Sequence, residues 1–490
     1  FNDAITATTI ALNGSSTLTI SYTGAITVAG NITDTSTSNT INVLFATADT
    51  APALVTFSGA AVAADTINIG SNGTKGANVL FSGSTGVTAT NLRLYSGNHI
   101  DEDTTVTFND DLTVGTLYFD DYWDTPAGET KAIFATNNDA TISGNIRGSN
   151  AANEGTIQVT GSTKTFTGTI GNTVGINLYD IDGTAIFEGS ISSTLCCGGS
   201  STIDIDGTAT FNSSVLVTSI DNDGTATFKS DVTAATANDG TLTLTPNGDN
   251  NITHTGAISG AGTLNAVEAD DGAVNSVTFS TTVAAATFNI GSTTKSGVVI
   301  LNGDTTVTNL NIYAGDVNEE DSTVTVNGDL DTTTTTLDDG TNSAVTKIIF
   351  ADTDTVTITG AITAATANDG TIQVTGTNKT FSGTIGGTRI GTLDINETST
   401  YTGAVTVNNL DIAASKTATF KNNITLNTSA TINSSAKLLV ASADSAAAIT
   451  VTGSVLGASD GVGTVQITNT GGTTFTTTVG SSSYSLALID

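Results

Sequence analysis

The chain has 490 residues, of which 38% are hydrophobic, 5% aromatic and only 12% charged. Its 46 acidic and 13 basic residues give a formal net charge of −33, which excludes nucleic acid as a partner, because phosphate binding requires a basic surface. No apolar run reaches about 18 residues, so we expect no membrane insertion.

The start of the chain and its composition predict a secreted β protein. The chain begins at Phe1 and contains no methionine, so we expect a processed product or an excised segment whose signal peptide is already gone. Threonine and valine favour extended backbone, while glycine, asparagine and aspartate favour turns. Helical periodicity is nearly absent, and the three prolines form no linker.

A long internal repeat aligns the first half of the chain with the second. Residues 155–171 (GTIQVTGSTKTFTGTIG) match residues 370–386 (GTIQVTGTNKTFSGTIG), an offset of 215, while residues 55–58 recur at an offset of 222. The drift indicates small loop deletions between units that keep their order. We therefore predict a first long β-repeat unit over residues 1–231 and a second, continuous with it, over residues 232–490.

Short strand–turn–strand units inside the long repeat predict the fold. Their inward and outward positions alternate with the period of two that a half-buried strand requires. A parallel β-solenoid, or β-helix, coils such units so that each irregular rung stacks on the next and like residues form ladders. Tandem β-sandwich domains are the alternative. Irregular rung lengths, repeated Asp-Gly-Thr corners and the lack of linkers favour the all-β solenoid.

Two acidic loops occupy equivalent positions in the long repeat. NHIDED, residues 98–103, aligns with DVNEED, residues 316–321. Clustered carboxylates and carbonyls supply the roughly six to eight oxygen ligands that calcium prefers, so calcium is the predicted cofactor, and a solvated acidic loop is the alternative. The candidate ligands are Asp101, Glu102, Asp103, Glu319, Glu320 and Asp321.

An aromatic cluster at residues 118–124 contains the sole tryptophan. Because tyrosine and tryptophan dominate interface hot spots, the cluster is predicted to be a contact surface. A sugar-binding patch and a plug that caps the core are the alternatives. The candidate interface residues are Tyr118, Phe119, Tyr122 and Trp123.

An Asp-x-Asp-Gly motif recurs three times and provides a second set of candidate metal ligands. Glycine after aspartate is typical of a turn with positive φ. Stacked in a solenoid, such turns bring carboxylates together, and a cation between rungs converts their repulsion into attraction. Ordinary turn chemistry is the alternative. The aspartates are Asp180 and Asp182, Asp204 and Asp206, and Asp221 and Asp223.

Thiolate and catalytic sites have little support in the sequence. Cys196 and Cys197 are adjacent, which excludes a disulfide framework and a four-thiolate zinc site; an irregular loop, a vicinal disulfide and a metal site remain as alternatives. The two histidines, His99 and His254, lie in no G-x-S-x-G or H-E-x-x-H context. We therefore predict that the chain is not an enzyme.

The Thr/Gly/Asn β-repeats, the acidity and the TFTGTIG-like segments at residues 165–171 and 380–386 resemble two classes of surface protein. One is the bacterial or archaeal surface-layer (S-layer) class, which implies calcium and self-assembly. The other is the autotransporter-passenger class, including large rickettsial surface antigens, which implies adhesion.

Together these observations predict a non-enzymatic structural subunit of an extracellular surface layer or filament at the cell surface. We expect it to assemble with copies of itself through divalent cations at its acidic loops, and a cell-surface glycan is a second candidate partner. An adhesin or carbohydrate-binding passenger is the alternative function.

Overall fold

The structure, a computed structural model, describes most of the chain. The described residues are 4–45, 52–71, 75–83, 86–98, 102–121, 128–135, 138–149, 154–172, 174–193, 200–246, 250–268, 275–316, 321–341, 344–352, 354–441 and 447–490. Among them are many β-strands and no helix, and so no helix that could span a membrane. The predicted all-β parallel β-solenoid is confirmed and has about 18 turns.

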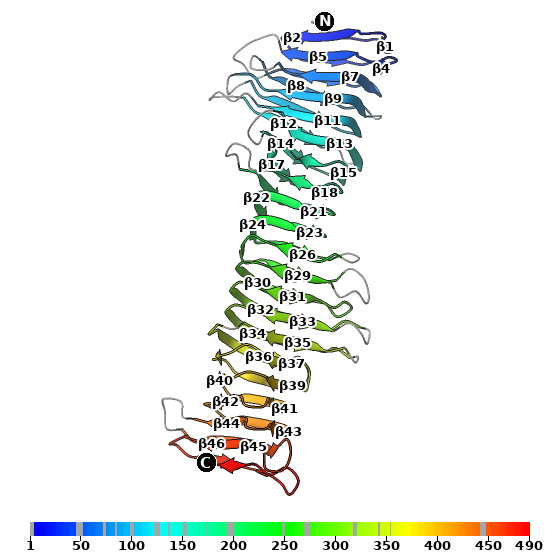
Figure 1. The fold of residues 1–490 in the computed structure, drawn as a ribbon. Helices are drawn as coiled ribbons and strands as arrows, with labels where there is room; N and C mark the ends of the chain where they lie inside the picture. The colour runs from blue at the N-terminus through cyan, green and yellow to red at the C-terminus, as the bar shows by residue number, and fades with distance from the viewer. Residues whose placement is uncertain are drawn as a thin grey trace. The chain divides into compact units, whose positions relative to one another are not determined.

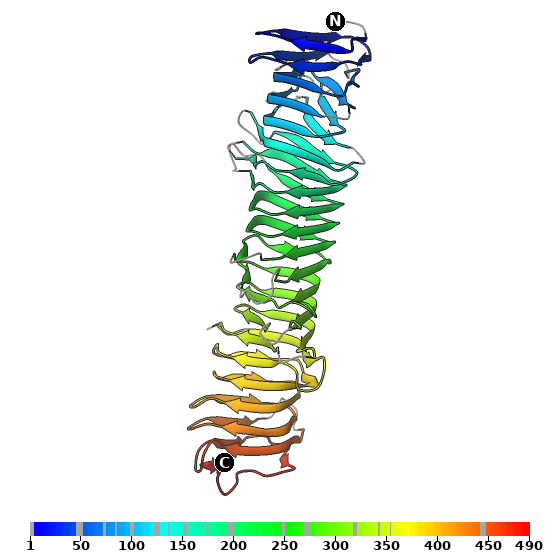
Figure 2. The same ribbon diagram turned by 90° about the vertical axis from the view of Figure 1, so that its right-hand side faces the viewer.

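The chain divides into two compact units, Phe1–Thr241 (unit 1) and Leu242–Asp490 (unit 2). Within each unit, each turn places one strand segment in each of three parallel sheets, here called A, B and C (Figures 1 and 2). Many long strands bend at a corner, so their first part belongs to one sheet and their second part to the next. Most strand residues therefore have a register partner in the neighbouring turn, apart from register shifts such as the one between Thr113 and Thr116.

The strands of unit 1 are as follows. Sheet A contains β1 (Thr9–Leu12), β4 (Asn31–Asp34), β15 (Lys164–Phe166), β18 (Thr184–Phe187), β21 (Thr208–Phe211) and β23 (Thr225–Phe228). Sheet B contains β2 (Thr17–Tyr22), β5 (Thr40–Phe45), β16 (Ile170–Gly171) and β19 (Ile191–Ser192), and it shares β7 (Val62–Ile69), β9 (Val87–Tyr95), β11 (Leu112–Asp120) and β13 (Ala140–Gly148) with sheet A. Sheet C contains β3 (Ile26–Val28), β6 (Leu54–Phe57), β8 (Ala77–Phe81), β10 (Thr104–Phe108), β12 (Thr130–Phe134), β14 (Glu154–Val159), β17 (Ile176–Ile181) and β20 (Thr202–Ile205), and it shares β22 (Val215–Asn222) and β24 (Val232–Asn238) with sheet B. The boundary between the units falls inside β25 (Thr241–Leu244).

Unit 2 repeats this arrangement, and its sheets are lettered by the equivalence of their strands in the long repeat, not by hydrogen bonding to the sheets of unit 1. Sheet A contains β27 (Ile258–Ser259), β38 (Lys379–Phe381), β40 (Ser399–Tyr401), β42 (Thr417–Phe420), β44 (Lys437–Val440), β46 (Thr464–Ile467) and β48 (Leu488–Ile489). Sheet B contains β28 (Thr263–Ala266) and β47 (Thr473–Phe475), and it shares β30 (Val283–Ile290), β32 (Thr305–Tyr313), β34 (Leu330–Asp338) and β36 (Thr357–Ala364) with sheet A. Sheet C contains β26 (Ile252–His254), β29 (Ser276–Phe279), β31 (Val298–Leu301), β33 (Ser322–Val326), β35 (Thr346–Phe350) and β37 (Thr371–Val374), and it shares β39 (Ile385–Ile395), β41 (Val405–Ile412), β43 (Ile424–Ile432) and β45 (Ile449–Gly457) with sheet B.

A ladder of phenylalanine rings runs through the core of unit 1. Neighbouring ring centroids are 4.5 to 5.4 Å apart. Such contacts stabilise a core by about 0.5–1.5 kcal/mol per pair beyond the burial of apolar area. Two sets of register partners form the ladder, Phe57 to Phe134 on sheet C and Phe166 to Phe228 on sheet A. An edge-to-face contact between Phe134 and Phe166 joins the two sets. The members of the ladder are Phe57, Phe81, Phe108, Phe134, Phe166, Phe187, Phe211 and Phe228.

Candidate functional site

Sheet C of unit 1 carries a row of carboxylates on its outer surface. Asp180, Asp204 and Asp221 are register partners on β17, β20 and β22. The isoleucines beside them, Ile181 and Ile205, are fully buried, so strand alternation sends the aspartates outward. A second aspartate follows each strand at the turn. We call these six residues, Asp180, Asp182, Asp204, Asp206, Asp221 and Asp223, the carboxylate row.

Close approach between turns explains the glycine that follows each turn aspartate. The N–H of Gly207 donates to the Ile181 carbonyl oxygen of the preceding turn at 2.7 Å. A Cβ on Gly207 would lie 2.1 Å from the Gly183 carbonyl oxygen, so only glycine fits. These glycines do not have positive φ, and the sequence-based reason for them is corrected accordingly: the constraint is space between turns.

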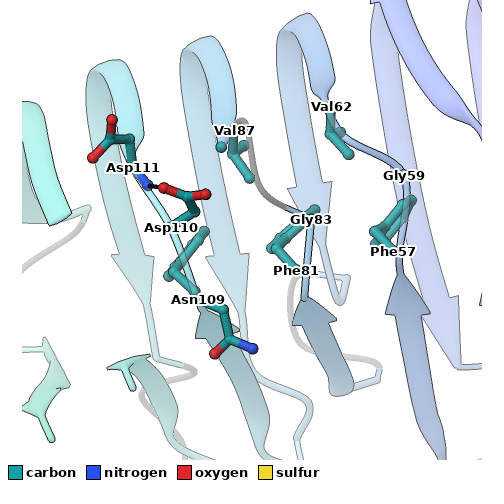
Figure 3. Close-up of a pocket in the computed structure, with 11 residues that line it drawn as sticks. Phe57, Gly59, Val62, Phe81, Gly83, Val87, Asn109, Asp110 and Asp111 are labelled. Carbon is teal, nitrogen blue, oxygen red and sulfur yellow. Dashed lines mark hydrogen bonds between the residues drawn. The ribbon is translucent and has the colours of Figure 1, made fainter. Parts of the chain in front are cut away.

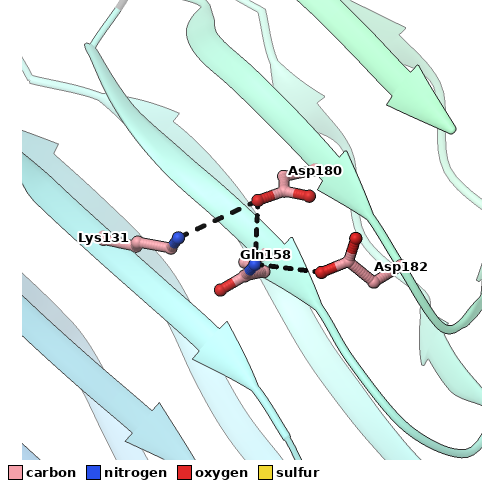
Figure 4. Close-up of polar contacts among 4 residues, drawn as sticks. All are labelled: Lys131, Gln158, Asp180 and Asp182. Carbon is pink, nitrogen blue, oxygen red and sulfur yellow. Dashed lines mark hydrogen bonds and ion pairs between the residues drawn. The ribbon is translucent and has the colours of Figure 1, made fainter. Parts of the chain in front are cut away.

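One end of the carboxylate row is partly neutralised (Figure 4). The Gln158 side-chain amide donates to Asp180 Oδ2 at 2.8 Å and to Asp182 Oδ2 at 3.1 Å. Lys131 Nζ lies 3.8 Å from Asp180 Oδ2. Partial burial, and then the neighbouring Asp182, raise the pKa of Asp180, while Lys131 opposes them.

In the middle of the carboxylate row, Asp204 is repelled by the neighbouring aspartates. Partial burial raises the pKa of Asp204, and the charges of Asp206, Asp221 and Asp180 raise it further. Adjacent turns of a parallel sheet are about 4.8 Å apart, where two exposed unit charges repel by roughly 1 kcal/mol in water. Keeping this carboxylate ionised therefore destabilises the isolated chain.

We expect Asp204→Asn to stabilise the isolated chain at neutral pH. The amide removes one charge from the row and donates to a flanking carboxylate, as Gln158 does for Asp180. The expected rise in Tm is about 1–2 °C at low ionic strength, shrinking in molar salt because exposed charges are then screened. Thermal melts followed by circular dichroism at both ionic strengths measure it. A fall in Tm, or a rise that salt does not reduce, would contradict the repulsion.

Unit 2 contains a shorter row of carboxylates, in which amide side chains flank the aspartates. Asp394 and Asp411 are register partners on β39 and β41. Gln373 and Asn396 donate to Asp394 Oδ2 at 2.7 and 2.9 Å, and Asn433 donates to Asp411 Oδ1 at 2.7 Å. Because Asn396 stands where unit 1 has Asp182, unit 2 provides a natural pattern for neutralising the turn aspartates.

The described acids of the two acidic loops bind backbone N–H groups. Glu102 is 1% exposed, and its Oε2 accepts from the Asn98 N–H at 3.0 Å. Asp103 Oδ1 accepts from the Glu129 N–H at 2.8 Å, and Asp321 Oδ1 accepts from the Val345 N–H at 2.8 Å. Glu102 therefore fixes its own loop, whereas Asp103 and Asp321 join their loops to the backbone of the next turn. The other candidate ligands of these loops, Asp101, Glu319 and Glu320, lie outside the described residues.

Two further half-buried acids were not predicted from the sequence. Asp121 Oδ1 accepts from the Thr130 N–H at 2.7 Å and from its hydroxyl at 2.6 Å, and Oδ2 accepts from the Gly155 N–H at 2.8 Å. Asp339 makes the same three contacts in unit 2. Burial raises the pKa of Asp121. The aligned Asp-Asp pairs at 120–121 and 338–339 were the signal that could have found them.

Of the four residues predicted to form an aromatic contact surface, the structure places Tyr118 on the outer side of sheet B in unit 1. Tyr118 projects outward between Arg93 and Arg147, whose guanidinium carbons lie 4.4 and 4.9 Å from its ring centroid. Arg147 also donates to the Tyr118 hydroxyl at 3.2 Å, and this bond is the main reason that the Tyr118 pKa is lowered. We call Arg93, Tyr118 and Arg147 the Arg–Tyr–Arg strip.

The neighbouring Phe119 cannot belong to a contact surface. Its side chain is 0% exposed, because strand alternation turns it into the core, and the expectation for this residue is corrected. Tyr122 and Trp123, like Cys196, Cys197 and His99, lie outside the described residues.

Comparison with known proteins assigns no family. No family model matches the chain, and no curated protein or solved structure matches it. The likeness to S-layer proteins and autotransporter passengers therefore stays a prediction from composition and motifs.

A metal ion needs clustered ligand atoms, whereas a larger ligand needs a cavity or groove. None of their His, Cys, Asp and Glu side chains form a group of three or more able to hold a metal ion, so calcium stays a prediction. A concavity beside the phenylalanine ladder, lined by Phe57, Phe81 and Asp110 among others, has a volume of about 10 Å³ (Figure 3). That volume holds about one water molecule. An open groove of about 380 Å³ on unit 2 is lined by small side chains and Asp331.

Proposed function

We propose that the chain is a non-enzymatic structural subunit of an extracellular surface layer or filament, which assembles with copies of itself when divalent cations neutralise its carboxylate row. The observation that supports this is the register of Asp180, Asp204 and Asp221, which places like charges in line on successive turns. Such a row destabilises an isolated chain, and sequences depart from locally favourable choices mainly at functional sites.

Divalent cations from the solvent can turn the carboxylate row into a contact between copies. The net charge of −33 makes copies repel one another. Divalent cations shared between carboxylates of two copies convert this repulsion into attraction. The parallel register repeats the same outward positions on successive turns.

We expect millimolar calcium to drive the purified chain into ordered arrays or filaments, and a chelator to dissolve them. Negative-stain electron microscopy and sedimentation velocity measure both states, with circular dichroism to check that the fold persists. The comparison variant is the triple change Asp182→Asn, Asp206→Asn, Asp223→Asn, which copies Asn396 of unit 2. It keeps the three register aspartates and removes half of the charge of the row, so it should need more calcium than wild type to assemble. A wild-type chain that stays monodisperse at every calcium concentration would disprove the proposal.

An adhesin or carbohydrate-binding passenger is the second candidate function. The observation in its favour is the open groove of about 380 Å³ on unit 2, a size within the usual range for ligand sites. Its lining consists of glycine, alanine, threonine, valine and aspartate, without the aromatic platform on which sugar rings stack. An adhesin of this build remains a monomer in calcium and in chelator alike, so the same experiment separates the two functions.

A further inference from the structure

The Arg–Tyr–Arg strip is a local reversal of charge on a strongly acidic chain. The chain contains three arginines, and two of them, Arg93 and Arg147, stack on opposite sides of one tyrosine ring. Toward the N-terminus, the register partners that continue the Arg–Tyr–Arg strip are Asn68 and Asn42. The Asn68 side-chain amide donates to Asn42 Oδ1 at 2.9 Å. The positive charge is thus confined to three successive turns.

Unit 2 shows that the fold does not need this charge. The equivalent row on its sheet B runs through Asn311, Thr336 and Thr363, all of them uncharged. The Asn311 amide bonds to Asn289 at 2.9 Å, in the same way as the asparagines of unit 1. A neutral ladder therefore suffices for stacking, and the arginines of unit 1 call for another explanation.

The strip and the carboxylate row have matching spacing. Arg93 and Arg147 are separated by two turns, with Tyr118 between them. Asp180 and Asp221 are also separated by two turns, with Asp204 between them. Since turns of a parallel sheet are spaced by about 4.8 Å in both cases, two guanidinium groups can meet two carboxylates when solenoid axes run side by side.

We propose that the Arg–Tyr–Arg strip of one copy binds the carboxylate row of a second copy. This inference rests on the proposed function and names the surfaces that meet during assembly. Guanidinium groups bind carboxylates through charge-assisted, often paired hydrogen bonds, and a tyrosine between them adds contact area typical of interface centres. Cations neutralise the carboxylates that the two arginines leave uncovered.

The location of the two surfaces favours an open array. The strip lies on sheet B and the carboxylate row on sheet C of the same unit, so each copy carries one of each. A contact between two different surfaces leaves one of each unused on every pair of copies. Such a head-to-tail contact repeats into an open filament unless the rotation between copies closes it into a ring.

Complementary charge reversal tests the proposal. One variant carries Arg93→Glu and Arg147→Glu, and the other carries Asp180→Lys and Asp221→Lys. We expect each variant alone to need at least tenfold more protein than wild type to assemble in calcium. An equimolar mixture should assemble near the wild-type concentration, because every contact in an alternating array then pairs opposite charges. Electron microscopy and sedimentation velocity measure the threshold, and circular dichroism confirms the fold.

Two controls keep the result specific. Asn311→Glu with Thr363→Glu places the same negative charges on the equivalent row of unit 2 and should leave the threshold unchanged. Arg93→Gln with Arg147→Gln removes the charge without reversing it and should raise the threshold less than the glutamates do.

The outcomes separate this inference from the proposed function. Loss in each variant with rescue in the mixture supports the contact. Two results would overturn the contact and leave the proposed function standing. One is assembly of the arginine-reversal variant at the wild-type concentration, and the other is an equimolar mixture that assembles no better than either variant alone. Absence of wild-type assembly in any calcium concentration would overturn both.

Discussion

Phe211→Ala is expected to lower the free energy of unfolding of unit 1 by about 3–5 kcal/mol. The ring is 1% exposed and lies 5.0 Å from Phe187 and 4.5 Å from Phe228, centroid to centroid. Its removal leaves a cavity between two turns that the rigid backbone ladder cannot close, because each turn is hydrogen-bonded to both neighbours. Urea denaturation followed by circular dichroism and by tyrosine fluorescence measures the loss.

The adjacent Thr210 provides the matched control. It is half-buried and lies on the outer side of the same strand, so Thr210→Ala should change stability by no more than about 0.5 kcal/mol. Phe211→Leu keeps most of the volume and should lose much less than alanine does. In a repeat protein each turn is stabilised by its neighbours, so the damage should spread to the adjacent turns. If the alanine variant lost less than about 1 kcal/mol, the ladder would not be a main stabilising element.

The strands and their inward positions could be predicted because the alternation is local. The T-A-T-F segments at residues 208–211 and 225–228 are recognisable in the sequence, and the structure pairs them residue for residue. The stacked Asp-Gly corners were predictable for the same reason, since the motif recurs at nearly regular intervals. The reason for the glycine in each corner was not predictable, because it is the close approach of the neighbouring turn, which is a tertiary contact.

The Arg–Tyr–Arg strip could not be predicted because its members meet only after the turns are stacked. Tyr118 is 25 residues from Arg93 and 29 residues from Arg147, and the intervening loops differ in length. A shift of one residue in register would send each side chain to the opposite face of the sheet. The same alternation places Phe119, the residue after Tyr118, in the core. The role of Asp121 escaped prediction because one of its backbone donors, Gly155, is 34 residues away along the chain.

Unit 2 should lose stability on mild acidification because of His254. This side chain is 1% exposed on β26, where its ring centroid lies 6.2 Å from that of Phe279 and its Nδ1 bonds to the Gly256 carbonyl oxygen at 2.9 Å. Burial lowers its pKa from 6.5 to about 4. The unfolded chain therefore takes up this proton first as the pH falls. The stabilising effect of the neutral ring is complete above pH 6.5 and is lost between pH 6.5 and 4, a difference of about 3 kcal/mol.

His254→Phe isolates this effect from the acids of the chain. A phenylalanine continues the aromatic packing against Phe279 and cannot take up a proton. The carboxyls with raised pKa values, such as Asp204, titrate in both proteins and oppose the histidine effect, so the informative quantity is the difference between wild type and variant. Urea denaturation at pH 7.5, 6, 5 and 4 should show the variant gaining up to about 3 kcal/mol over wild type as the pH falls. Parallel pH profiles for the two proteins would show that His254 is hydrated or protonated in the folded chain and that its burial has no stabilising role.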